Sequence, residues 1–356
     1  FTLTYGEAVD LGYCRPITFH RHEGNFSVQF QDGDTASVNG QGVTMEGDQL
    51  ERLPSLKRAI DFIKLASTPI YENDGSPSLS SYPASMLEWG MQKLDDMKLQ
   101  MPKAGGLVIA PTIEMANYMA DLLEMLEGIR PFVVHNQVNN SDAKIEAFRS
   151  NNHRWLVSVG MVSEGVDIPR LRILVYLPHA KTELAFRQAM GRVVRNFGPN
   201  DTTRAYVVMP AFQIFDEYAR RVEREMSPKF RSEPKGPTTK LCPVCSSENE
   251  LSATHCSVCD EEFPLGHTRF KSCSECETPN PIHAKNCMAC GESFEHEFNI
   301  NLDEALRHGA IARGMDLDES EVVISENISQ DFRRKVLNSG DEVLINIIKT
   351  IPEETY

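Results

Sequence analysis

Two closely spaced arginines, Arg192 and Arg195, are the residues of this chain best suited to bind a polyanion. On a continuous helix they share one face with Gln188 and Gly191, at positions i, i+3, i+4 and i+7. Guanidinium groups on one face repel one another unless an anion lies between them. Because paired arginines suit phosphate, the pattern favours a nucleotide polyphosphate. A solvated basic face on an ordinary amphipathic helix is the alternative.

Eight of the nine cysteines form a second chemical pattern. They make two copies of C-x2-C-x10-C-x2-C, and Asn249 and Phe263 of the first copy match Asn280 and Phe294 of the second. The eight residues are Cys242, Cys245, Cys256, Cys259, Cys273, Cys276, Cys287 and Cys290. Two tight turns can present four thiolates to one ion, which predicts two structural Zn²⁺ sites without an open position for water. An iron–sulfur cluster is the alternative.

Three points about the cysteine pattern stay open. The ligands can be shared between the two copies, with the first pair of one copy completing the second pair of the other. His255 and His283 lie nearby, but eight cysteines already fill two sites, so these histidines are expected to be bystanders. Cys14 is expected to be a small core residue.

The chain has 356 residues, room for two or three domains, and a net charge of -15. This acidity argues against a purely electrostatic nucleic-acid coat, but not against a motor that grips the backbone in a narrow channel. The paired cysteines indicate a reducing compartment, and we expect a cytoplasmic protein with no membrane span or secretory signal. Since the chain opens at Phe1 rather than Met, we expect a piece of a longer protein.

The pattern of apolar residues predicts the elements that position these groups. Short β-branched runs alternate with amphipathic stretches over residues 101–226, which predicts an α/β domain with a parallel sheet flanked by helices. Sites in such sheets are expected beyond the carboxyl ends of the strands. A helix is expected over Thr182–Asn196, packed through a second, apolar face. That face consists of Phe186, Met190, Val193 and Phe197.

The flanking regions are less informative. Residues 1–100 are expected to connect two domains, with a hairpin of Ile17–His20 and Phe26–Phe30 followed by helices. Residues 227–240 form a linker, 241–297 a double zinc ribbon, and 298–356 an acidic helical segment in which we find no chemistry.

Three segments, in this order, resemble the motifs of the second RecA-like domain of superfamily 2 helicases and translocases, of the DEAD/DEAH or restriction type. Gly105–Pro111 resembles the motif IV strand, and Trp155–Pro169 resembles motif V. Gln188–Arg195 matches the motif VI pattern Q-x-x-G-R-x-x-R at every fixed position. In this family two RecA-like domains bind ATP with Mg²⁺ between them.

The resemblance implies roles for individual residues. Arg192 and Arg195 would reach the γ-phosphate, with Arg195 as the arginine finger, and Gln188 would link the nucleotide to the nucleic acid. Asp167 would lie near the ribose hydroxyls, although a turn or capping carboxylate is the alternative. Gly165 and Gly191 would allow close backbone approach.

The resemblance also implies contacts to a nucleic-acid backbone. The expected contacts are Pro111, Thr112 and Ser163. Val159 stands where many relatives have a threonine that contacts a phosphate, so Ser163 is the candidate donor in motif V.

The sequence contains neither G-x-x-x-x-G-K-[ST] nor a D-E-x-H or D-E-A-D run. An ATP site would therefore need an N-terminal RecA-like domain outside this chain. The favoured interpretation is the C-terminal half of an ATP-dependent helicase or translocase acting on DNA or RNA, DNA being favoured. The alternatives are a non-catalytic helicase-derived scaffold, whose ribbons bind nucleic acid or protein, and a translocase that serves a nuclease.

Overall fold

The computed structural model describes most of the chain up to residue 310. The described residues are 3–29, 35–40, 42–46, 61–137, 140–159, 167–177, 180–196, 201–232, 236–263, 270–273, 275–276, 278–281, 284, 286–292, 297–301, 305, 308 and 310. No helix within these ranges is long and apolar enough to cross a membrane.

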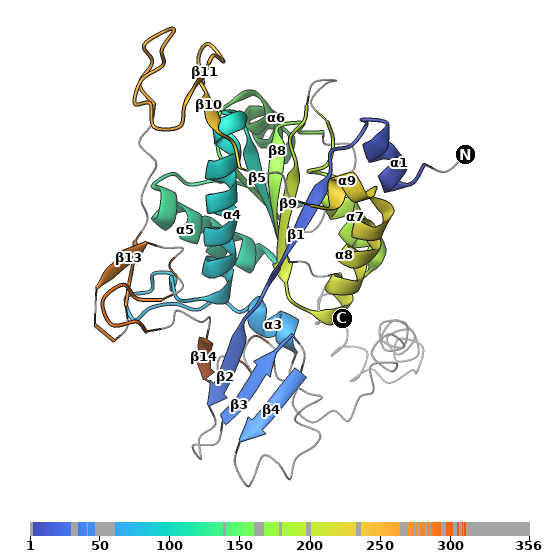
Figure 1. Ribbon diagram of the computed structural model, residues 1–356. Helices are drawn as coiled ribbons and strands as arrows, with labels where there is room; N and C mark the ends of the chain where they lie inside the picture. Colours follow the sequence, from blue (N-terminus) through green and yellow to red (C-terminus); the bar gives the residue numbers. More distant parts are fainter. Residues whose placement is uncertain are drawn as a thin grey trace.

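A six-stranded parallel sheet forms the centre of the molecule (Figure 1). Its order is β1-β9-β8-β5-β7-β6, and every pairing is parallel. The strands are β1 (Ile17–His22), β5 (Gly105–Ala110), β6 (Phe132–Val134), β7 (Trp155–Val159), β8 (Leu171–Tyr176) and β9 (Ala205–Pro210). All residues of β5 and β8 are buried, as expected for strands covered on both faces. The predicted RecA-like α/β sheet is confirmed.

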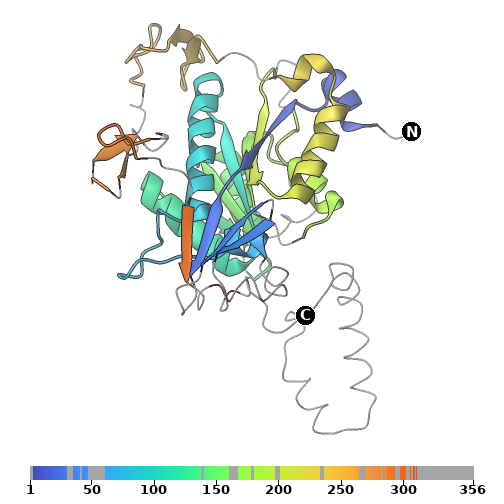
Figure 2. The same ribbon diagram turned by 60° about the horizontal axis from the view of Figure 1, so that its bottom comes forward.

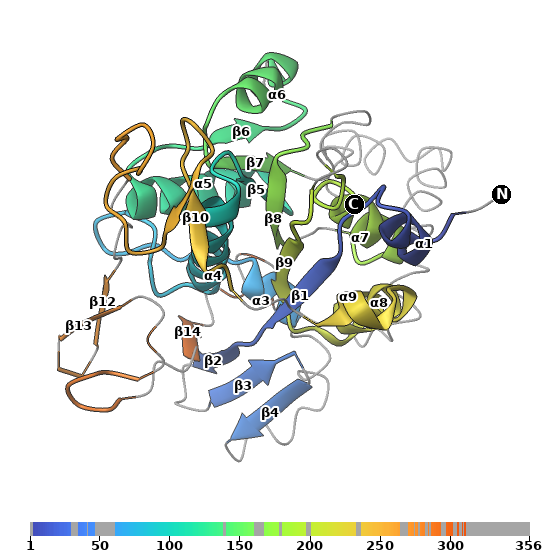
Figure 3. The same cartoon turned by 45° about the horizontal axis from the view of Figure 1, so that its top comes forward.

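Helices cover both faces of this sheet (Figures 1 and 3). Helices α4 and α5 pack on one side, while α7 and α8 lie on the other and α1 contacts α8. The helices are α1 (Tyr5–Asp10), α3 (Phe62–Ala66), α4 (Tyr82–Gln100), α5 (Ile113–Glu127), α6 (Ser141–Ser150), α7 (Glu183–Met190), α8 (Gln213–Glu225) and α9 (Pro228–Arg231). The ends of α5 follow from its sequence, since the Thr112 hydroxyl caps the first turn and Gly128 adopts a left-handed conformation (φ 73°) after the last.

The predicted hairpin near the N-terminus is wrong. β1 pairs with β9, with Ile17 opposite Ala205, whereas β2 (Asn25–Gln29) pairs in a different sheet. Alternation of apolar and polar residues identifies a half-buried strand but does not select its partner. Together with α4, which packs on β8 and β9, β1 belongs to the same layered unit as residues 101–226, although both were expected in a connecting region.

A second, four-stranded sheet has the order β14-β2-β3-β4, with β3 (Thr35–Asn39), β4 (Gly42–Glu46) and β14 (Glu297–Asn301). Figure 2 shows β14, from far along the chain, beside β2. Aromatic rings join this sheet to its surroundings, because Phe26 contacts Phe298, Tyr82 and Phe62 at centroid distances of 5.3, 5.4 and 5.6 Å. The predicted helical character is wrong for residues 298–301, and residues 311–356 lie outside the described ranges.

Two small antiparallel pairs precede β14. The first is β10 (Thr239–Leu241) with β11 (Glu248–Glu250), and the second is β12 (Phe270–Ser272) with β13 (Pro279–Pro281). Each pair belongs to one of the cysteine repeats. β10 also contacts α4, so the first repeat lies against the sheet domain.

The first prediction concerns Gly106 in β5. A Cβ atom there would lie 2.1 Å from the buried ring of Trp155, so Gly106→Ala overpacks the sheet. We expect the free energy of unfolding to fall by about 1–3 kcal/mol in urea titrations. Gly236→Ala, where nothing lies within 4 Å of the new atom, is the control. Equal stability of the two variants would contradict this packing role.

Candidate functional site

The helix that was predicted to carry the paired arginines ends before both of them. α7 ends at Met190, and the next turn is tightened by bonds from Arg192 N–H to Ala189 O (3.1 Å) and from Val193 N–H to Met190 O (3.0 Å). The prediction that Arg195 lies on the same helix face as Gln188 is therefore wrong. The predicted apolar face is confirmed for Phe186, Met190 and Val193, which are buried; Phe197 lies outside the described residues.

An N-terminal segment pulls the chain out of the helix after Val193. The Arg15 N–H donates to Val194 O at 2.7 Å, and Cys14 forms an antiparallel bridge with Arg195. The backbone at Arg195 is thus extended rather than helical. Cys14 is partly buried and packs against the main core, and burial raises the pKa of its thiol.

The structure brings together one residue of the motif V segment and one of the motif VI segment. Arg195 Nη1 lies 3.2 Å from Asp167 Oδ2, and the two side chains are 53% and 46% exposed. An exposed pair of this kind contributes at most about 1 kcal/mol, so a more highly charged anion can displace the carboxylate. Gln188 and Arg192 are partly buried nearby in the chain, and Gly165 and Ser163 lie outside the described residues.

The candidate residues lie at two opposite edges of the sheet. Asp167 comes just before β8, and the segment bridged to Arg195 comes just before β1, so this pair lies at the amino ends of the strands. Pro111 and Thr112 directly follow β5 and lie at the carboxyl ends. The prediction that the sites lie beyond the carboxyl ends is therefore wrong for the Asp167–Arg195 pair.

A buried ionic cluster lies at the same amino edge as Arg195. Asp201 Oδ2 accepts from Nη2 of Arg15 at 2.7 Å and from Nη2 of Arg172 at 2.9 Å. The arginine side chains are 0% exposed and the aspartate is 4% exposed. Arg15 also donates to the carbonyls of Leu171 (3.0 Å) and Arg195. The cluster thus fixes the backbone of Arg195 against the starts of β1, β8 and β9.

Sequence reasoning missed this cluster. Burial lowers the pKa of Arg15 and of Arg172, and the charge of Asp201 opposes the shift. Removing such groups from water is costly unless they are paired. Arg172 itself could have indicated the cluster. It is a charged residue in the otherwise apolar run of β8, and a buried arginine requires a buried partner.

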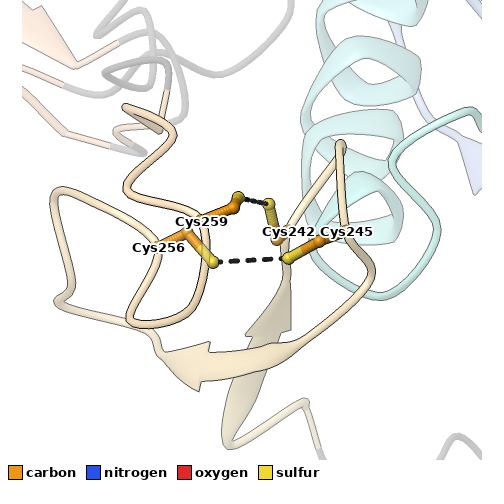
Figure 4. Close-up of side chains that lie close together, drawn as sticks. All are labelled: Cys242, Cys245, Cys256 and Cys259. Carbon is orange, nitrogen blue, oxygen red and sulfur yellow. Dashed lines mark hydrogen bonds between the residues drawn. The ribbon is translucent and has the colours of Figure 1, made fainter.

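The cysteines form two separate clusters, one in each repeat. In the first, Cys242 Sγ lies 3.6 Å from Cys259 Sγ, and Cys245 Sγ lies 3.6 Å from Cys256 Sγ (Figure 4). In a tetrahedral site with Zn–S distances of about 2.3 Å, the sulfurs would lie about 3.8 Å apart, so the spacing fits one metal ion. Ligands shared between the repeats, the alternative left open by the sequence, are not what the structure shows.

The second cluster repeats the first. The Sγ distances are 3.6 Å between Cys273 and Cys290 and 3.5 Å between Cys276 and Cys287. His255 is not part of either cluster, and His283 lies outside the described residues.

The asparagines that match between the repeats support the ligands. The Asn249 amide donates to Cys256 Sγ (3.7 Å), and its oxygen accepts the N–H of Ser257 at 2.8 Å. Asn280 makes the same contacts, to Cys287 Sγ at 3.5 Å and from the N–H of Met288 at 2.7 Å. Such contacts orient a metal ligand and stabilise the thiolate.

A hydroxyl adds to this stabilisation in the first cluster. The side chain of Ser247 lies 3.0 Å from Cys256 Sγ, and this hydrogen bond lowers the pKa of the Cys256 thiol to about 5. The thiolate is the form that binds a metal.

Residues 90–197 match the family described as helicase conserved C-terminal domain. Over 206 residues the chain is 32% identical to an uncharacterized protein of Mycobacterium leprae (strain TN), a match that covers 58% of this chain and 31% of that protein. The chain thus spans about a third of that relative. The match of residues 90–197 to a helicase C-terminal domain confirms the resemblance drawn from the three motifs.

Solved structures that are similar to the chain include the following two. One is the ATP-dependent Type ISP restriction-modification enzyme LlaBIII bound to DNA, with 14% identity, a TM-score of 0.36, and coverage of 66% of this chain and 16% of that chain. The other is domain 2 of a DEAD-box helicase bound to an RNA duplex, with 12% identity, a TM-score of 0.31, and coverage of 40% and 55%.

The second prediction tests the buried cluster. Asp201→Asn leaves two buried guanidinium groups without a carboxylate, so we expect the free energy of unfolding to fall by about 3–5 kcal/mol. Urea titration measures the change.

Asp216→Asn is the matched control, because Asp216 also accepts from two arginines, Arg21 and Arg220, each at 2.8 Å, but is 27% exposed. Its loss is expected to cost about 1 kcal/mol or less. An Asp201 variant as stable as the Asp216 variant would show that the buried cluster does not hold this edge together.

Proposed function

We propose that this chain is the C-terminal half of an ATP-dependent nucleic-acid helicase or translocase. The observation that carries the proposal is the Asp167–Arg195 pair, which joins two helicase motif segments beside a backbone fixed by buried charges. The ATP site would lie between this domain and an N-terminal RecA-like domain of the same protein. That domain would supply the phosphate-binding loop and the ligands of Mg²⁺.

In this proposal Arg195 exchanges Asp167 for the γ-phosphate when the two domains close. Its guanidinium then stabilises the charge that develops on the transferred phosphoryl group, with Arg192 as a second cation. Asp167, once released, is free to accept hydrogen bonds from ribose hydroxyls, beside Gly165. Gln188 lies on α7, which runs from the carboxyl edge of the sheet back to the amino edge, so it can link the nucleotide to the nucleic acid. Gly191 offers no side chain to obstruct closure.

The nucleic acid, for which we favour DNA, would bind through Pro111 and Thr112 at the carboxyl edge and through Ser163 of the motif V segment. The Thr112 oxygen accepts the Met115 N–H at 3.1 Å, which leaves its O–H proton for a phosphate oxygen. Contacts of this kind are independent of sequence, as a translocating motor requires.

We further propose that each cysteine cluster holds one structural Zn²⁺. The double ribbon would bind nucleic acid or a protein partner. The tips of its first two turns, Val244 and Val258, are 65% and 71% exposed. Metal-binding thiolates require a reducing setting, so we expect the protein in the cytoplasm.

The third prediction tests the arginine finger in the full-length protein. Arg195→Ala is expected to lower nucleic-acid-stimulated ATP hydrolysis by about 10³–10⁵-fold, as for other arginine fingers. Phosphate release measures the rate with and without single- and double-stranded DNA and RNA. The present chain alone is expected to show negligible hydrolysis.

Arg130→Ala is the matched control. Arg130 is 48% exposed and pairs with Asp121 and Glu124, much as Arg195 pairs with Asp167, but it lies outside the three motif segments. It should leave the rate unchanged. An unchanged rate of ATP hydrolysis in the Arg195 variant would favour the alternative, a non-catalytic helicase-derived scaffold.

The fourth prediction concerns the metal. The chain should contain two Zn²⁺, and Asn249→Ala should weaken binding at one of them about 10–100-fold, because the amide no longer supports Cys256. Competition with a chromophoric chelator measures the release of each equivalent. Asn280→Ala is the matched variant and should affect the other ion. Release curves identical to that of the unaltered protein would contradict the supporting role of these asparagines.

A further inference from the structure

An open pocket is lined by residues of β1, α8 and α9, none of which belongs to the helicase motif segments. Figure 3 shows these three elements next to one another. Its volume is about 330 Å³. The lining residues are Arg21, Asp216, Arg220, Glu223, Arg224 and Arg231. Four arginines against two acids give a formal charge of +2 in a chain whose net charge is -15.

Two of these arginines are held in place by carboxylates. Arg21 donates from Nη1 and Nη2 to Glu223 at 2.8 and 3.0 Å and from Nε to Asp216 at 2.8 Å. The hydrogen bond with Glu223 raises the pKa of Arg21. Arg220 donates only its Nε to Asp216. Both carboxylates therefore already accept hydrogen bonds from arginines, and the Nη groups of Arg220 can still donate to an anion.

The other two arginines have no carboxylate partner among the described residues. Arg231 donates from Nε to Met226 O at 2.9 Å and from Nη2 to Arg224 O at 3.1 Å. These bonds fix its guanidinium over the last carbonyls of α8 and offset the negative end of the helix, which would otherwise repel an anion. Arg224 is exposed. The pocket therefore presents positioned N–H donors with an excess of positive charge.

The lining contains no aromatic or apolar side chain, so it offers no surface on which a base or an apolar peptide could stack. Guanidinium groups match the geometry of phosphate. We propose that this pocket binds phosphate groups of a nucleic-acid backbone, outside the groove between the two RecA-like domains. The choice of nucleic acid among phosphate-bearing ligands rests on the proposed function.

The fifth prediction measures binding without ATP. The probe is a fluorescein-labelled single-stranded DNA oligonucleotide, and its anisotropy is followed over a series of salt concentrations. In the double variant Arg220→Ala with Arg224→Ala, binding should weaken. The slope of log K against log salt should become shallower by about 0.7 for each phosphate that the variant no longer binds. Glu223→Gln removes a negative charge from the pocket and should strengthen binding.

The matched control is the double variant Arg130→Ala with Arg149→Ala. It makes the same change in net charge at two exposed, ion-paired arginines elsewhere, Arg130 in the loop after α5 and Arg149 in α6. Thermal unfolding confirms that each variant folds. Equal weakening in both double variants would overturn the pocket but leave the proposed function standing, whereas no DNA binding by the unaltered protein would count against both.

Competition with the labelled oligonucleotide shows which class of anionic ligand the pocket binds. Inorganic pyrophosphate should displace the oligonucleotide only at far higher concentration, because it offers two phosphates rather than a long row of them. Displacement at equal phosphate concentration would overturn the assignment to a backbone in favour of a free phosphate compound. Equally effective displacement by polyglutamate would overturn it in favour of an acidic protein.

Discussion

The arrangement of the amino-terminal edge of the central sheet depends on one buried interaction, the sharing of the Asp201 carboxylate between Arg15 and Arg172. Arg15 lies just before β1, Arg172 lies within β8, and Asp201 lies just before β9. These are three neighbouring strands of the sheet. Since the three side chains are almost completely buried, the Asp201 carboxylate favours the charged form of both arginines, and the cluster fixes the register at which the strands begin. The cluster thereby holds β1 beside β9, although these strands lie far apart in the sequence.

This constraint explains why α7 stops where it does. A helix that continued through Arg195 would give up the bonds from Arg15 to the carbonyls of Val194 and Arg195. Two kinds of ion pair therefore act on different parts of Arg195. The buried cluster holds the backbone of Arg195, while the exposed contact to Asp167 leaves the Arg195 side chain free to exchange partners. In the proposed function Arg195 would need both properties, a fixed position and a weakly held charge, to contact a transient phosphate.

A structural feature could be predicted from the sequence where it depends on residues close together in the chain, and not where it depends on residues far apart. Strands such as β5 and β8 were predictable because burial on both faces demands continuous apolar runs. The two cysteine clusters were predictable because the spacing of two cysteines encodes a tight turn. The partner of β1 was not predictable, since alternation in Ile17–His22 suits any half-buried strand. The end of α7 was not predictable either, because it depends on Arg15, which lies far away in the sequence. The resemblance to helicase motifs supplied residue types but not the separation of the site residues onto two edges of the sheet.

That separation requires a physical connection between the edges, and α7 provides one. It begins at Glu183, after the carboxyl end of β8, and ends at Met190, close to the fixed backbone at Val194. Its side chains also reach α8, where Arg187 pairs with Glu225 at 2.6 Å. The ribbons join the same framework at two points, through β10 on α4 and through β14 on β2. The segment that holds both cysteine clusters is therefore bounded by one element that packs on α4 beside the central sheet and one that pairs within the second sheet.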